Sequence, residues 1–154
     1  MARLESQSKI LYYPTPDSVV EQIARRFTIK TTDHVRLVDP CCGTGKALAD
    51  FINLVGNGKP GNVETLGIEI SYKRAEEAMQ TLDTVLPTSF YDVHTPAHWD
   101  DRSVSLAFNN PPYDWSQFKE LRNNKQRSLR HELLFVEWTT PKIVTGGHHI
   151  IIVP

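Results

Sequence analysis

The chain has 154 residues, of which 40% are apolar and 23% are charged, and its formal net charge is -1. This composition excludes a disordered chain and is typical of one globular domain with a buried core, while the near-neutral charge gives no overall sign of nucleic-acid binding. No apolar run reaches the roughly 20 residues of a membrane span, and the start has no secretion signal, so we expect a cytoplasmic protein without a membrane partner.

The apolar pattern predicts strands that alternate with helices. The first helix runs from Asp17 to about Phe27, with Thr15 as its N-cap and Pro16 in the first helical position. Pro141 should kink or end the last helix, and the polar residues 114–130 are predicted to form a loop with some helix. The predicted strands are 34–40, 63–70, 88–93, 103–108 and 148–154, and the predicted helices are 17–27, 46–55, 71–82 and 131–144.

This alternation is typical of a Rossmann-like α/β fold, with a doubly wound and mainly parallel sheet. We interpret residues 1–154 as one domain, in which residues 1–30 form an N-terminal motif and helix. The last strand is continuously apolar from Ile150 to Val153, as in a parallel strand covered on both faces. Such a strand makes a poor sheet edge. We therefore expect a sheet truncated after its fifth strand, which either continues in a longer protein or is covered by a partner chain.

The first strand-to-helix turn reads "LVDPCCGTG" (37–45). Glycines there allow a tight turn and a close ligand, and the following helix N-terminus favours negative groups. Glu69 ends the next strand, where a carboxylate can accept ribose hydroxyls, and Asp92 follows the third strand, where it can accept from an amine. "GKA" (45–47) lacks the hydroxyl of a phosphate-binding loop. The acids predict a nucleoside ligand without phosphates, although an aspartate and two glycines alone are as often plain turn chemistry.

A second motif follows the fourth predicted strand. "FNNPPYDW" (108–115) places Asn110, two prolines and Tyr113 directly after an apolar run. Taken alone, an Asn-Pro pair favours a rigid turn. Downstream of a nucleoside crevice it instead indicates a pair of hydrogen-bond acceptors beside a stacking ring. Asn109 is interpreted as the end of the strand.

Four motifs together resemble the class I S-adenosylmethionine-dependent methyltransferases, and among them the amino-methyltransferases that methylate N6 of adenine in DNA. The motifs are "YYPTP", "DPCCGTG", "GIEI" and "NPPY", in the order of the gamma group, and the resemblance covers Tyr12 to Pro154. It implies the class I methyltransferase fold, S-adenosylmethionine as cofactor, DNA as partner and a place in restriction-modification. RNA bases and protein glutamine stay open as substrates, because the NPPY motif also occurs in methyltransferases that act on them.

The resemblance also implies which residues bind the cofactor. Asp39 would hold its ammonium group, Glu69 its ribose and Asp92 its adenine amine. The other residues implied to contact it are Tyr13, Thr15, Pro40, Cys41, Gly43, Gly45, Ile70 and Asn110.

For catalysis, the resemblance implies the four residues of the NPPY motif. The Asn110 side-chain oxygen and the Pro111 carbonyl would accept the hydrogens of the target amine, Pro112 would help to fix the chain, and Tyr113 would stack on the base. The family's domain continues through two further strands, and gamma members add a target-recognition domain; this sequence contains neither. A non-catalytic cofactor-binding domain, or a subunit that needs a partner, is therefore the other interpretation.

No metal site is predicted. Pro96 interrupts the histidine pair at positions 94 and 98, and the adjacent histidines at 148 and 149 would point to opposite faces of a strand. Two adjacent cysteines, Cys41 and Cys42, are too few for zinc and indicate reduced thiols. Residues 114–130 carry five Lys or Arg and two acidic residues, a net +3 that could contact phosphates or simply lie in solvent.

Overall fold

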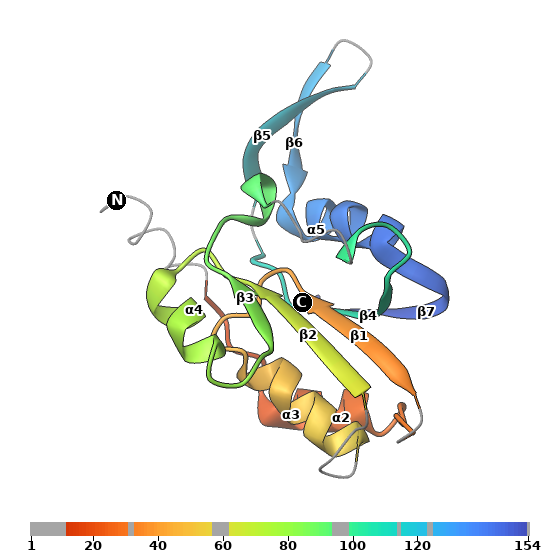
Figure 1. The fold of residues 1–154 in the computed structure, drawn as a ribbon. Helices are drawn as coiled ribbons and strands as arrows, with labels where there is room; N and C mark the ends of the chain where they lie inside the picture. The colour runs from red at the N-terminus through yellow and green to blue at the C-terminus, as the bar shows by residue number, and fades with distance from the viewer. Residues whose placement is uncertain are drawn as a thin grey trace.

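A five-stranded parallel sheet forms the centre of the protein (Figure 1). The computed structural model describes residues 12–30, 33–56, 62–93, 99–113, 115–122 and 125–153, without the side chains of 115–122 and 125–129. The strand order is β3-β2-β1-β4-β7, and all four pairings are parallel. The predicted Rossmann-like fold class is therefore confirmed. The strands are β1 (His34–Asp39), β2 (Asn62–Ile68), β3 (Thr84–Leu86), β4 (Val104–Asn109) and β7 (Ile143–Ile151).

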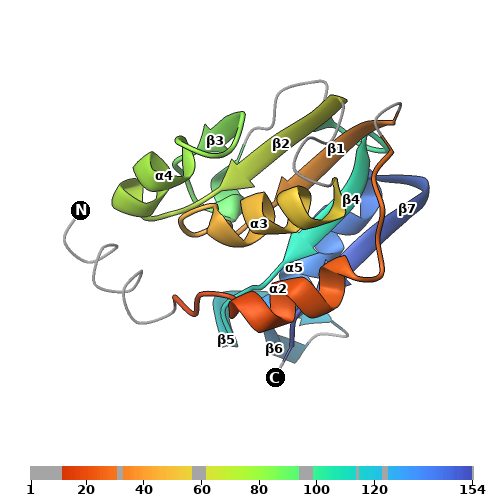
Figure 2. The same cartoon turned by 90° about the horizontal axis from the view of Figure 1, so that it is seen from below.

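Helices cover both faces of this sheet (Figure 2). Helices α2 (Asp17–Ala24) and α3 (Lys46–Val55) lie on one face and α5 (His131–Thr139) on the other, while α4 (Tyr72–Ala78) lies beside β3. Successive strand residues point to opposite faces, so each strand contributes to two cores. One core, under α2 and α3, includes Val20, Leu37, Leu48, Phe51 and Phe108. The other, on the α5 side, includes Val38, Leu66, Trp99 and Ala107.

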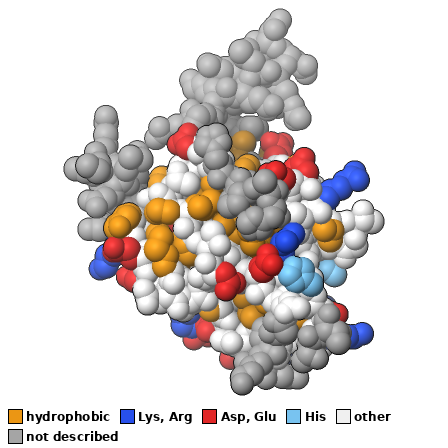
Figure 3. All heavy atoms as spheres, viewed as in Figure 1, with side chains coloured by type: hydrophobic (Ala, Val, Ile, Leu, Met, Phe, Trp, Pro, Cys, Tyr) orange, Lys and Arg blue, Asp and Glu red, His pale blue; other side chains and the backbone are white. Residues whose placement is uncertain are grey.

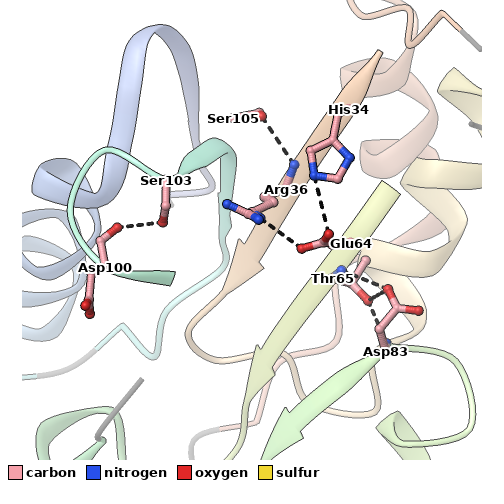
Figure 4. Close-up of polar contacts among 8 residues, drawn as sticks. All are labelled: His34, Arg36, Glu64, Thr65, Asp83, Asp100, Ser103 and Ser105. Atoms are coloured by element: carbon pink, nitrogen blue, oxygen red, sulfur yellow. Dashed lines mark hydrogen bonds and ion pairs between the residues drawn. The ribbon is translucent and has the colours of Figure 1, made fainter. Parts of the chain in front are cut away.

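The carboxyl ends of the central strands are the place where a ligand site is expected. β1 pairs with β2 on one side and with β4 on the other, so the chain reverses its direction of winding beside β1. In open α/β sheets, ligands bind beside such a switch point at the carboxyl ends of the strands. At the opposite end, side chains of β1 and β2 pair with each other: Glu64 accepts from Arg36 Nε at 2.8 Å and lies 3.3 Å from His34 Nε2 (Figure 4).

The third strand was predicted in the wrong place. It is Thr84–Leu86, whereas the predicted segment 88–93 contains a 3-10 turn, η1 (Phe90–Asp92). The physical reason is a tertiary contact that precedes the strand. Asp83 Oδ2 accepts from both the amide and the hydroxyl of Thr65 at 2.8 Å, and the Asp83 amide donates back to Thr65 Oγ1 at 2.7 Å (Figure 4). These three hydrogen bonds hold Asp83 against β2, so that pairing with β2 begins at the next residue, Thr84.

The ends of two helices also differ from expectation. Pro16 is the N-cap of α2, and no side chain caps that helix, so the prediction of Thr15 as N-cap was wrong. The hydroxyl of Thr15 has another partner, described below. Pro141 ends the last helix as expected: α5 stops at Thr139, and the 3-10 turn η3 (Thr140–Lys142) leads directly into β7.

Residues 115–122 and 125–130 form the two strands of a β-hairpin, and not the loop with some helix that was predicted for this segment. Strands β5 (Trp115–Arg122) and β6 (Lys125–Arg130) pair antiparallel in a separate two-stranded sheet. The hairpin extends away from the body of the protein (Figure 1). The missed sequence signal is an Asn-Asn pair at 123–124 between two runs that contain aromatic and aliphatic residues, because asparagine suits two-residue hairpin turns. Across the described ranges, no helix is both long and apolar enough to span a membrane.

Candidate functional site

Asp39 ends β1 and is a buried carboxylic acid. Its side chain is 3% exposed, and its Oδ1 accepts from the Cys41 amide at 2.9 Å. Burial raises the pKa of Asp39 to about 7, and the nearby charge of Glu69 adds to the rise. A positive group placed beside this carboxylate would stabilise its ionised form. Asp39 therefore suits a cationic ligand group at neutral pH.

The glycine loop follows directly. Gly43 and Gly45 have φ of 57° and 77°, the left-handed region that favours glycine, and Gly45 is the N-cap of α3. A Cβ on Gly45 would lie 2.9 Å from Thr81 Oγ1 and 3.2 Å from the Ala78 backbone, so α4 packs against the loop here. A Cβ on Gly43 would lie 2.5 Å from the ring of Tyr12. Tyr12 therefore covers this glycine.

Glu69 fastens the glycine loop to β2 and α4. It is 4% exposed, and its Oε2 accepts from the Gly43 amide at 3.0 Å. Its Oε1 accepts from the Ser71 amide at 2.7 Å and from Arg74 Nη2 at 2.6 Å. The Arg74 guanidinium in turn lies 4.5 Å from the centre of the Tyr12 ring. A carboxylate oxygen can accept two hydrogen bonds, so the described contacts leave one position on Oε2 for a ligand hydroxyl.

The Asn110 side chain is held in one orientation by the N-terminal segment. Its Nδ2 donates to the Tyr13 carbonyl at 3.0 Å and to Thr15 Oγ1 at 2.9 Å. Because a carbonyl only accepts, these bonds decide which end of the amide carries the hydrogens. The Asn110 Oδ1 is thereby presented as an acceptor. It receives the Tyr113 hydroxyl at 2.6 Å, which leaves a second lone pair.

Tyr113, the last residue of the NPPY segment, lies beside the end of β7. Its hydroxyl is also 3.3 Å from the Ile152 carbonyl, and its ring centre is 6.1 Å from that of Tyr13. Tyr13 is 59% exposed, so the two rings border an open face. Burial raises the pKa of Tyr113, which keeps its hydroxyl protonated as a donor. Pro111 is buried and Pro112 half-buried, so the segment itself is packed against the body.

The structure brings most of the predicted residues to one edge of the sheet. Pro40 is buried in the turn after β1, whereas Asp92 lies exposed in η1, six residues beyond β3. Ile70 is 46% exposed just before α4. Figure 3 shows apolar side chains gathered on the side of the molecule where α4 lies. Sequence reasoning gave no role to Tyr12, although Tyr12 opens the YYPTP motif, or to Arg74, which lies outside the four motifs.

The two cysteines and the histidines of the described ranges show no sign of a reactive or metal site. Burial raises the pKa of the Cys41 and Cys42 thiols well above the usual range, so both stay protonated and inert. Within the described part of the chain, no group of His, Cys, Asp and Glu could hold a metal ion. The histidine pair at 94 and 98 lies outside the described residues.

Comparison with known proteins shows where the chain belongs. The model of the uncharacterised methyltransferase family DUF6094 matches residues 1–154. The chain belongs to this family. No curated protein sequence matches it.

Solved structures that resemble this DUF6094 chain share its fold. A class I S-adenosylmethionine-dependent methyltransferase from Listeria monocytogenes is 21% identical with a TM-score of 0.72, over 91% of this chain and 46% of that one. The type I restriction-modification methyltransferase subunit from Streptococcus thermophilus is 16% identical with a TM-score of 0.64, over 94% and 34%. The type IIG restriction endonuclease BpuSI is 17% identical with a TM-score of 0.60, over 92% and 20%. The DUF6094 chain thus spans less than half the length of each.

Proposed function

We propose that the protein is an S-adenosylmethionine-dependent N-methyltransferase that methylates N6 of adenine in DNA. The single observation that carries the proposal is the fixed amide of Asn110. Its hydrogens are taken by the Tyr13 carbonyl and Thr15 Oγ1, so that its oxygen is left to accept from an amine. Membership of a methyltransferase family supports group transfer, and the fold supports a class I cofactor site.

The residues around the glycine loop fit the proposed cofactor. Asp39 would hold the α-ammonium group, since a buried acid with a pKa near 7 gains most from a neighbouring cation. The left-handed turns at Gly43 and Gly45 shape the loop, and Glu69 would give its remaining acceptor position to one ribose hydroxyl. Tyr12 and Arg74 would form a wall of the site, because both lie against Gly43 or Glu69.

The chemistry asks mainly for positioning. S-adenosylmethionine, when bound, supplies an electrophilic methyl group on a sulfonium. An exocyclic amine is a weak nucleophile because its lone pair is delocalised into the ring. By accepting one N–H each, Asn110 Oδ1 and the Pro111 carbonyl would draw the nitrogen towards tetrahedral geometry and free that pair for in-line attack. The surplus proton then leaves the nitrogen to water, so no poised general base is needed.

DNA is the proposed polymer for two reasons. Two solved structures that share the fold are described as a restriction-modification methyltransferase subunit and a restriction endonuclease. The β5–β6 hairpin, which follows Tyr113 almost directly, also carries a positive formal charge. One alternative is methylation of an RNA base or of protein glutamine, which would use the same amine-binding groups, so the experiment must distinguish these substrates from DNA. The second alternative is a cofactor-binding subunit that does not transfer a methyl group on its own.

Calorimetry with S-adenosylmethionine tests the cofactor half of the proposal. We expect binding that Asp39→Ala weakens by at least tenfold, while Asn53→Ala, an exposed asparagine on α3, leaves it unchanged. The protein is then incubated with DNA, RNA and protein substrates, and the methylated products are identified by mass spectrometry. N6-methyladenine in DNA that falls about a hundredfold in Asn110→Ala supports the proposal. Methylation found only in RNA or protein would show that the proposed DNA substrate is wrong. Cofactor binding without methyl transfer to any of the three would favour a cofactor-binding subunit that needs a partner.

A further inference from the structure

Three polar side chains, one each from β4, α5 and β7, meet next to the start of the NPPY segment. Asn109 ends β4 and is 0% exposed, Thr139 ends α5 and is 0% exposed, and His149 lies half-buried on β7. His149 Nε2 is 2.8 Å from Asn109 Nδ2 and 2.9 Å from Thr139 Oγ1, and these last two atoms are 3.3 Å apart. The proposed chemistry assigns none of the three a task, although Asn109 is the immediate neighbour of Asn110.

The hydrogen bonds decide where the His149 proton sits. Within the described part of the chain, Asn109 Oδ1 is buried without a partner. If Nε2 carried the proton while the Asn109 amide kept its orientation, two N–H groups would face each other across the 2.8 Å between Nε2 and Asn109 Nδ2. If Nε2 is unprotonated, Asn109 Nδ2 donates to it, and Asn109 Oδ1 is the acceptor without a partner. Because Asn109 turns its N–H group and not its oxygen toward Nε2, the geometry favours the tautomer with the proton on Nδ1.

The end of β7 holds the NPPY segment at two further points. The Ile152 amide donates to the Asn109 carbonyl at 2.8 Å, and the Ile152 carbonyl lies 3.3 Å from the Tyr113 hydroxyl. That hydroxyl donates to Asn110 Oδ1. His149, three residues earlier and within β7, holds the Asn109 side chain. Asn109 and Tyr113, on the two sides of Asn110–Pro112, are therefore held by His149 on β7 and by Ile152 just after it.

We propose that His149 is a positioning residue for Asn110: neutral, with its proton on Nδ1, it accepts from the Asn109 amide and fixes the end of β4 from which the reacting segment leaves. This inference rests on the proposed function. Protonation would place an Nε2–H against the Asn109 N–H group, break their hydrogen bond and loosen Asn110. Methyl transfer is therefore lost as His149 gains its proton.

Among the described residues, the side chains bonded to His149 Nε2 are uncharged. They are Asn109 from β4 and Thr139 from α5. Among the charged residues of α5 and η3, Glu132 pairs with Arg130, Glu137 is exposed and Lys142 lies over the Trp138 ring. Burial lowers the pKa of His149 below its ordinary value, so the neutral form prevails at pH 7.

The first experiment reads the tautomer by NMR and needs no activity. Long-range proton–nitrogen spectra of the ¹⁵N-labelled protein at pH 7.5 should show His149 with Nε2 bare, assigned by the signal that His149→Gln removes. On acidification, the side-chain amide signals of Asn110 should move together with the His149 titration. A proton on Nε2 at pH 7.5, or Asn110 signals that ignore the titration, would overturn the inference.

The second experiment is a pH profile of kcat on adenine-containing DNA at saturating cofactor, so that cofactor affinity does not contribute. We expect kcat to fall about tenfold per pH unit below a pKa that lies under 6.5. His149→Gln, which offers an acceptor that cannot titrate, should remove this fall, while His148→Gln, an exposed neighbour on the opposite face, should keep it. An unchanged fall in His149→Gln contradicts the inference. If no substrate is methylated at all, the proposed function is wrong, and the NMR result still decides the tautomer and its coupling to Asn110.

Discussion

At the scale of single residues, the unusual group is the carboxyl group of Asp39, which is 3% exposed and whose pKa is raised by burial. Its pKa of about 7 lies above the value of the unfolded chain, near 3.9. The folded protein therefore binds this proton more tightly than the unfolded chain does. The contribution of Asp39 to stability is fully present below pH 4 and is lost as the pH rises towards 7. Ionised Asp39 therefore destabilises the folded protein near neutral pH, and a bound cationic group would offset this loss.

This predicts a pH-dependent cofactor affinity. If the α-ammonium group of S-adenosylmethionine binds ionised Asp39, a proton must leave that carboxylate at acid pH. The dissociation constant measured by calorimetry should be roughly twentyfold larger at pH 5.5 than at pH 7.5. The ammonium group keeps its charge over this range, so the change reports the titration of Asp39. Asp39→Asn should bind more weakly at every pH and show a flat profile. A wild-type profile without slope would contradict the assignment of the ammonium group to Asp39.

At the scale of elements, the turn between β1 and α3 depends on glycine for two separate reasons. Gly45 has φ of 77°, and a Cβ there would lie 3.2 Å from the Ala78 backbone of α4. Gly146 on β7 has φ of 81°, and no atom of the described residues lies within 4 Å of a Cβ built there. The two positions share the conformational demand and differ in packing. They therefore form a matched pair in which the close approach of α4 can be measured.

We expect Gly146→Ala to lower the free energy of unfolding by about 1–2 kcal/mol, the cost of a left-handed backbone for a residue with a Cβ. Gly45→Ala should lose about 2–4 kcal/mol, because overpacking against α4 adds to the same cost. Urea denaturation followed by circular dichroism gives both values. Equal losses in the two variants would mean that α4 moves aside and that its contact with the loop is weak.

The elements that the sequence predicts well are those whose cause is local. The buried runs of β1, β2 and β4, and the glycines that require positive φ, are all visible in a short window of residues. The third strand was misplaced because Thr65, eighteen residues earlier, decides where it starts by bonding Asp83.

The same division applies to the candidate site. The motifs predict Asp39, Glu69 and Asn110, but they do not predict the contacts that hold these side chains. Arg74 on Glu69, Tyr12 on Gly43 and the Tyr13 carbonyl on Asn110 all join segments that are brought together only by folding. The motifs therefore name the candidate residues, and the tertiary structure supplies the contacts that orient them.

At the scale of the whole molecule, charge is distributed unevenly. Residues 115–130 of the β5–β6 hairpin contain five Lys or Arg and one Glu, a formal charge of +4, so the rest of a chain of net charge -1 carries -5. The hairpin leaves the body next to the NPPY segment (Figure 1). Arg130 at its base is already paired with Glu132. The remaining basic residues of the hairpin, Lys119, Arg122, Lys125 and Arg127, are therefore the ones expected to meet phosphates.

The salt dependence of DNA binding tests this arrangement. Each phosphate contact adds about 0.9 to the slope of log K against log salt, so replacing Arg122, Lys125 and Arg127 together by Gln should lower the slope by roughly 2–3. The loss should be similar for all DNA sequences, because phosphate contacts carry no sequence information. Replacing Arg25, Arg26 and Lys30 by Gln, three exposed residues at the end of α2 and beyond, removes the same charge elsewhere. If both triple variants lower the slope equally, the net charge of the protein matters and the hairpin is not the DNA contact. If only the hairpin variant does, and its cofactor affinity is unchanged, the hairpin holds the polymer whose base reaches Asn110.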